Sequence, residues 1–193
     1  MNEPFFDRRR SEDRSTRLES DVFEIRRPAN VVAMPDSASP TTCELLATMA
    51  LDHAIDGDQL LARRAAEDSM LMIESLASGA RRADRVTAAR AALTTGEALL
   101  LLHEAHRAKD CFEIARRFFD VERDLPRAAQ ARVGLAKALL ALHDPSARAV
   151  LEDAGEIFED IGNDEAVLAI DFALRQAQVD FEESPRSFHA RAR

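Results

Sequence analysis

This sequence contains no tryptophan and no tyrosine. Aromatic side chains are the usual stacking platforms for single-stranded nucleic acid, so the absence of these two residues argues against that class of ligand. The formal net charge of -9 points the same way, because an acidic protein repels a phosphate backbone on average. We therefore expect no nucleic-acid partner.

Cysteines and long apolar runs are scarce as well. Cys43 and Cys111 lie far apart and match no metal-ligand spacing, which argues against a disulfide framework and fits a reducing compartment. The longest aliphatic run, 98–102, is too short to cross a bilayer. No apolar segment follows the arginines at 8–10, so they form no export signal. These features predict a cytoplasmic protein without membrane insertion.

The motifs of common enzyme sites are missing too. Six glycines leave little material for a phosphate-cradling loop, and the sequence has no Gly-x-Ser-x-Gly motif. We therefore predict no catalytic residues, no bound cofactor and no enzymatic activity.

A helical metal-dependent enzyme is the alternative from another class. It would use His103, His106 and Cys111, because two histidines three residues apart share a helix face and zinc accepts both residue types. Their spacing is one residue short of the metalloprotease motif. His103 and His143 also fit the C-terminal ends of equivalent helices, where an imidazole can cap free carbonyls. We favour that structural role and predict no metal.

Residues 1–40 differ from the rest of the chain. Arginines and acidic residues nearly balance there, and prolines interrupt any regular element. This composition predicts a flexible leader. The alternative is a docking arm whose apolar patches, 22–25 and 31–34, lie on the chain's own scaffold or on a partner. Ser11 lies in a sequence that resembles a basic-directed phosphorylation site.

From Thr41 onward, apolar residues recur with helical spacing and turn signals separate the segments. The expected helices span 41–55, 58–78, 84–106, 108–123, 128–142, 147–161 and 164–181. Residues 41–44 fit a capping box for the first helix, whose inner face would include Met49. Residues 94–97 fit a second capping box, so the third helix could instead break near Thr94. The tail, 182–193, is expected to fray.

The segment 96–104 is echoed at 136–144. The identical pairs are Ala98/Ala138, Leu99/Leu139, Leu100/Leu140, Leu102/Leu142 and His103/His143. An echo at this spacing is typical of stacked helical hairpins, because one hairpin cannot bury its apolar face alone. Gly96 falls inside a predicted helix, where glycine usually marks the close approach of another helix.

This region resembles the tetratricopeptide repeat family, which places a small residue midway along the first helix and Ala, an aromatic and Ala on the second. The matching residues are Gly96, Leu99, Ala108, Phe112 and Ala115. The resemblance covers roughly residues 41–181 and is generic in function. It implies an all-α fold, a right-handed α-solenoid of about three helical hairpins plus a C-terminal capping helix.

The resemblance also implies a protein–protein adaptor that binds a partner segment in a groove lined by the first helices. The residues expected to face that groove are Arg90, Leu93, Glu97, Gln130, Val133 and Lys137. An alternative is a cytoplasmic chaperone for a secretion or assembly substrate. A homo-oligomer is a further possibility, since a divergent terminal repeat often leaves an apolar face that a second copy can cover.

Overall fold

A computed structural model describes residues 39–79 and 81–183, with side chains placed as far as residue 176. The predicted N-terminal arm up to residue 38, Ser11 within it, and the tail beyond residue 183 lie outside the described residues. Within them the chain forms seven α-helices and no strand, which confirms the prediction of an all-α fold. The helices are α1 (Pro40–Ile55), α2 (Gln59–Ala77), α3 (Arg82–Leu101), α4 (Ala105–Glu122), α5 (Leu125–Ala141), α6 (Ala147–Asp160) and α7 (Asp164–Glu183).

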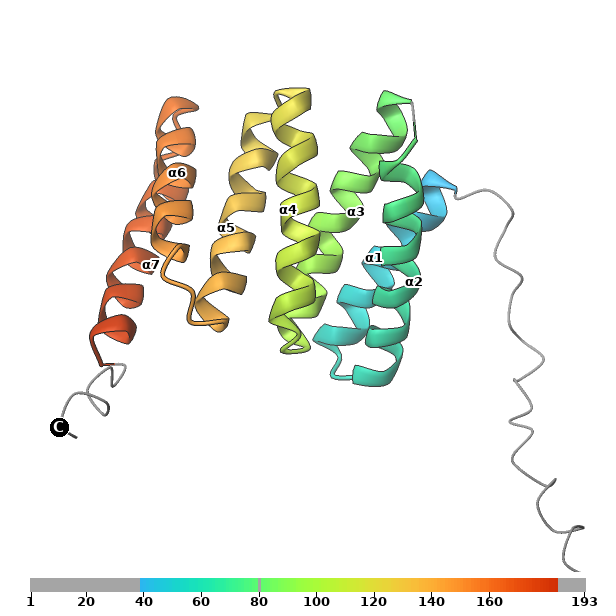
Figure 1. Ribbon diagram of the computed structural model, residues 1–193, viewed down its shortest axis with the longest axis horizontal. Helices are drawn as coiled ribbons and strands as arrows, with labels where there is room; N and C mark the ends of the chain where they lie inside the picture. The colour runs from blue at the N-terminus through green and yellow to red at the C-terminus, as the bar shows by residue number, and fades with distance from the viewer. Residues whose placement is uncertain (1–38, 80, 184–193) are drawn as a thin grey trace, which may run out of the picture. The chain divides into compact units, whose positions relative to one another are not determined.

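The helices lie side by side in chain order, from α1 and α2 at one end to α6 and α7 at the other (Figure 1). Each helix packs on its sequence neighbours, and α3 also contacts α1 and, over a smaller surface, α5. Most contacts therefore join nearby helices, as expected where each added hairpin buries the apolar face of the one before it.

Alanine supplies much of the core. The three clusters of buried residues lie among α1–α5, across α1–α6, and among α5–α7. Small side chains let the helices approach closely, and a few large side chains fill the space between them. The largest fully buried ones include Ile73, Leu99, Phe112, Phe119 and Leu151. Between α2 and α3, the buried hydroxyls of Ser69 and Thr95 share a hydrogen bond of 2.8 Å, so neither is left unsatisfied.

Helices α1, α3, α4, α5 and α6 all end in the same way. One or two residues beyond the last residue of each helix, the backbone is left-handed, with φ between 55° and 81°. These residues are Gly57, His103, Arg123, His143 and Gly162. At the end of α3, the amide of His103 donates to the carbonyl of Leu100 at 3.0 Å, and that of Glu104 donates to Leu99 at 2.8 Å. This pairing is the Schellman motif, which satisfies the last carbonyls of a helix.

These ends correct two of the predicted boundaries. The helix expected over 84–106 ends at Leu101, because His103 turns the chain before α4 begins at Ala105. At that turn the backbone amides, rather than an imidazole, satisfy the carbonyls of Leu99 and Leu100. The helix expected from residue 128 begins at Leu125, since Pro126 fits a first turn whose amides need no intrahelical partner.

Both predicted capping boxes are wrong. At the start of α1, Ser39 is the N-cap and Pro40 opens the helix, with no side-chain capping bond. The third helix does not break at Thr94, because α3 continues through it to Leu101. Met49, expected on the inner face of α1, is exposed instead, and Cys43 and Ala47 are buried.

Candidate functional site: a groove lined by α3, α5 and α7

A groove of about 750 Å³ lies on the side of the helical array formed by α3, α5 and α7. Side chains from these three helices form its walls, and residues of α4 and α6 contribute to its base. The lining is mainly apolar: Leu100, Leu101, Phe112, Val133, Gly134, Leu140, Leu151, Phe158, Ala166, Ala169, Ile170 and Ala173. Such a concave, mostly apolar surface with a few polar groups is the usual form of a binding site.

Two glycines shape the base of the groove around the ring of Phe112. A Cβ at Gly96 of α3 would come within 2.8 Å of this ring, and one at Gly134 of α5 would come closer still. Phe112 on α4 is therefore held between the backbones of two neighbouring helices and is fully buried. The expectation that Gly96 marks a close helix approach is confirmed. Because the ring fills the space between α3 and α5, it fixes the separation of two walls of the groove.

Three polar residues complete the lining: Glu97, Gln130 and Lys137. Glu97 on α3 and Lys137 on α5 occupy the same position in the 96–104 and 136–144 segments, so the echoed sequence places opposite charges on adjacent walls. Burial raises the pKa of the Glu97 carboxyl, and the nearby positive charge of Lys137 lowers that pKa by a smaller amount. The groove thus holds one carboxyl whose ionisation is disfavoured by its surroundings.

Four of the six predicted groove residues line this groove together: Glu97, Gln130, Val133 and Lys137. The other two, Arg90 and Leu93, lie on α3 outside its lining. Arg90 forms an ion pair of 3.4 Å with Glu44 of α1. Leu93 is partly buried against two of the core clusters. That any of the six binds a partner stays a prediction.

Sequence reasoning missed the whole contribution of α7 to the groove. Ala166, Ala169 and Ala173 recur three and four residues apart, and Ile170 lies among them. A stripe of small residues at helical spacing was the available signal. That signal alone does not reveal a groove, because helical periodicity cannot distinguish a face buried in the core from the wall of a groove.

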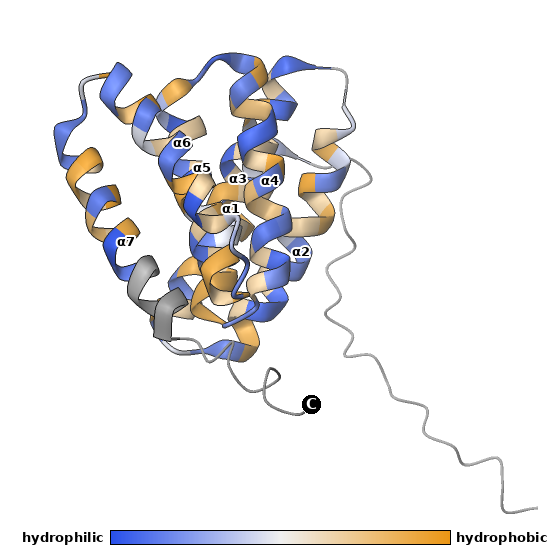
Figure 2. Ribbon diagram, turned by 60° about the vertical axis from the view of Figure 1, so that its left-hand side comes forward, coloured by the Kyte–Doolittle hydropathy of each residue, from blue (hydrophilic) through white to orange (hydrophobic). Residues whose placement is uncertain are grey.

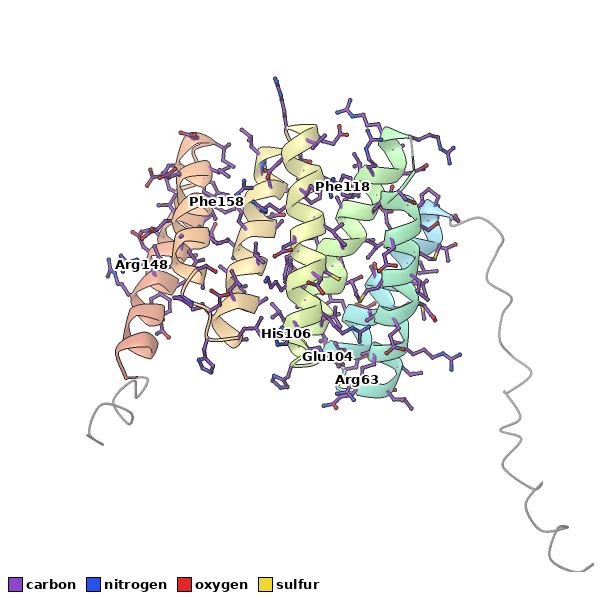
Figure 3. The ribbon with its side chains drawn as sticks, viewed as in Figure 1. Arg63, Glu104, His106, Phe118, Arg148 and Phe158 are labelled. Carbon is purple, nitrogen blue, oxygen red and sulfur yellow. The ribbon has the colours of Figure 1, made fainter. Side chains whose placement is uncertain are left out.

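The alternative metal site is not assembled. Cys111 is buried in the core, whereas His103 and His106 are exposed. His106 lies near the start of α4. In Figure 3 it lies along the same lower edge of the molecule as Arg63 and Glu104, which form an ion pair of 2.9 Å. Across residues 39–79 and 81–183, the structure brings together no group of three or more His, Cys, Asp or Glu residues that could hold a metal ion.

The two cysteines have the properties of core residues. Burial is the main cause that raises the pKa of each thiol, Cys43 and Cys111, to about 12. A thiol with so high a pKa is neither a nucleophile nor a ready metal ligand near neutral pH. Both are free and buried, so their role is to fill space between helices.

Two further findings concern membrane-spanning helices and similarity to known proteins. None of the helices in the described ranges is long and apolar enough to cross a membrane. No protein-family model, curated protein or solved structure matches the chain.

Proposed function

We propose that this protein is a non-enzymatic adaptor that binds a segment of a partner protein in the groove between α3, α5 and α7. The observation that carries the proposal is the groove itself, with its apolar lining from five helices and its few polar residues. An amphipathic helix docks in this kind of surface by placing apolar side chains in the groove and polar ones towards solvent.

The repetitive packing supports a tetratricopeptide-like, right-handed solenoid as the architecture. In such an array the first helix of each hairpin lines one side, which matches the contribution of α3, α5 and α7 to the groove. On this view α7 is the capping helix expected from the sequence. A chaperone that holds a secretion or assembly substrate would use the same groove, and it is one kind of adaptor within this proposal. The compartment expected for either is the cytoplasm.

Leu101 offers a direct test, because it lines the groove but is also exposed, so a charge there leaves the core intact. The matched control is Leu71 on α2, which is also exposed and does not line the groove. Tagged full-length wild type, Leu101→Glu and Leu71→Glu are purified from cells that make the protein naturally, and bound proteins are quantified by mass spectrometry.

The proposal predicts at least one near-stoichiometric protein whose recovery falls roughly tenfold with Leu101→Glu, as expected for an apolar hot spot. Recovery of the same protein with Leu71→Glu should equal that of the wild type. The proposal is wrong if the two variants retain the same proteins in the same amounts, or if the wild type retains none. A small molecule bound by the purified wild type and lost with Leu101→Glu would instead make this groove a ligand site.

A further inference from the structure

The left-handed residues at the helix ends define equivalent positions along the array. Gly57 follows the end of α1, and His143 follows the end of α5 at the same distance. Arg123 lies just before α5, and Gly162 lies just before α7. Positions counted from these residues can therefore be compared between α5, an internal helix, and α1 and α7, the first and last described helices.

One side of α5 packs on the helices that precede it, and we call this side its leading face. Ala131 and Leu135 of that face share clusters with residues of α3 and α4. Counted from the left-handed residue that follows each helix, Leu45 and Met49 of α1 occupy the same positions. Leu45 is 57% exposed and Met49 is 40% exposed. The leading face of α1 is thus apolar at the positions that internal packing uses, but no helix among residues 39–79 and 81–183 covers it.

The other side of α5 packs on α6 and shares a core cluster with residues of α6 and α7, and we call it the trailing face. Ala129 and Val133 of this face belong to the cluster that α6 and α7 complete. Counted from the left-handed residue that precedes each helix, Leu168 and Phe172 are their equivalents on α7. Leu168 is 69% exposed and Phe172 is 64% exposed. Figure 2 shows hydrophobic residues along α7, part of which lie on this uncovered side.

Each uncovered face carries one residue whose charge is opposite to that of a residue on the other face. Asp52 lies on the leading face of α1. Counted from the left-handed residue that follows each helix, it occupies the position of Ala138 in α5. Arg175 lies on the trailing face of α7. Counted from the left-handed residue that precedes each helix, it occupies the position of Ala136 in α5. Both are exposed, and each lies in the C-terminal half of its helix. If α1 packed along α7 in the same direction, Asp52 and Arg175 would lie near each other, with the apolar pairs meeting beside them.

We propose that the leading face of α1 in one copy binds the trailing face of α7 in a second copy, so that the molecules associate head to tail. The apolar part of the contact repeats the internal packing of the array, because apolar side chains meet at the positions where α5 meets its neighbours. The pair Asp52 and Arg175 lies beside them. Two different faces take part, so the contact is heterologous, and repeated association produces chains or closed rings. This surface is separate from the groove, and the inference does not depend on the adaptor function.

The test uses full-length protein and two charge-insertion variants. The leading-face variant is Leu45→Glu/Met49→Glu, and the trailing-face variant is Leu168→Glu/Phe172→Glu. All four side chains are exposed, so the fold should persist, and circular dichroism checks that it does. The control is Val121→Glu on α4, an exposed apolar residue (65%) on neither face. Sedimentation velocity gives the molecular mass at protein concentrations up to about 100 μM, at which a contact with a micromolar Kd is populated.

The wild type and Val121→Glu should grow in mass with concentration, whereas each face variant alone should remain monomeric. An equimolar mixture of the two face variants should form a species of two chains, because each retains the face that the other lacks. A wild type that stays monomeric at the highest concentration overturns the proposal. A leading-face variant that still associates while the trailing-face variant does not would show instead that α7 pairs with itself.

The charges provide a second test that leaves the apolar faces unchanged. Asp52→Arg should weaken association about threefold to tenfold, since it replaces attraction to Arg175 with repulsion. Adding Arg175→Asp in the same chain should restore it by reversing the pair. If the double variant is as weak as Asp52→Arg alone, the two residues do not meet and the proposed register is wrong.

Discussion

The ring of Phe112 lies against the backbone of Gly134, so closely that a Cβ at that glycine would overlap the ring. Phe112 is fully buried and also contacts Gly96, so it has little room to move away. This contact joins α4 to α5 beneath the groove. The separation of α3 and α5, and with it the width of the groove, therefore depends on two glycines and one aromatic ring.

Gly134→Ala should lower the free energy of unfolding by about 1–3 kcal/mol, the usual cost of overpacking a close-packed site. Helix propensity alone would predict a gain of up to about 1 kcal/mol. Gly155 on α6 is the matched control, because a Cβ there would make only an ordinary contact of 3.6 Å with Ile170. Urea unfolding should show a loss for Gly134→Ala and a small gain for Gly155→Ala. Gains of the same size at both positions would contradict the packing described above.

Replacing Phe112 with a smaller side chain should relieve the clash. In Phe112→Leu, the added Gly134→Ala should cost much less than it does in the wild type. Additive effects of the two substitutions would mean that the ring and the glycine are not in contact.

His143 should tolerate glycine better than a β-branched residue. Its backbone is left-handed, with φ of 55°, a conformation that glycine adopts freely and valine strongly disfavours. We expect His143→Gly to keep or raise the urea midpoint, and His143→Val to lower the free energy of unfolding by about 1–2 kcal/mol. If the imidazole were instead essential to the helix end, both substitutions would destabilise the protein equally.

The two thiols should be unreactive in the folded protein. Burial raises the pKa of both Cys43 and Cys111 to about 12, so at pH 8 almost no thiolate is present to attack a disulfide reagent. Ellman's reagent should label both cysteines in urea and neither at an appreciable rate in buffer. Rapid labelling of folded Cys111 would reopen the possibility that it acts with His103 and His106.

Glu97 should titrate above the usual range of glutamate. Burial raises its pKa and Lys137 partly opposes the rise, so Lys137→Gln should move the pKa of Glu97 higher still. NMR titration of the carboxyl carbon measures both values. An unchanged pKa of Glu97 in Lys137→Gln would mean that the lysine does not act on this carboxyl.

The raised pKa of Glu97 should also make the free energy of unfolding depend on pH, with a loss of stability as pH rises. Because the folded state holds this proton more tightly than the unfolded chain, the associated stability is fully present below its ordinary pKa of 4.5 and is lost as pH rises through the raised value. Glu97→Gln cannot ionise and escapes this loss. The stability of Glu97→Gln relative to the wild type should therefore increase from pH 4.5 upward.

Apolar spacing and turn residues were enough to predict the seven helices of the described residues, because both are local signals. The close approach at Gly96 was predicted from a glycine inside a helix, which is a local signal as well. Precise ends were harder to predict. The end of α3 depends on His103 adopting a left-handed backbone, which is uncommon for residues other than glycine.

The faces of the terminal helices could not be assigned from the sequence. Met49 and Phe172 belong to apolar patterns that look the same whether a neighbouring helix covers them or not. Glu97 and Lys137, in contrast, were both expected in a groove from the resemblance to the tetratricopeptide repeat family, and both line the groove that the structure forms.

Site-specific photo-cross-linking tests the central claim, that the groove binds a protein segment, most directly. The photoreactive residue p-benzoylphenylalanine replaces Gln130, an exposed residue lining the groove, or Asp153, an exposed residue of α6 outside it. Irradiation in cells that make the protein naturally should give a discrete covalent adduct with another protein from position 130 and none from position 153. Equal adducts from the two positions, or an adduct from position 153 alone, would contradict binding in the groove.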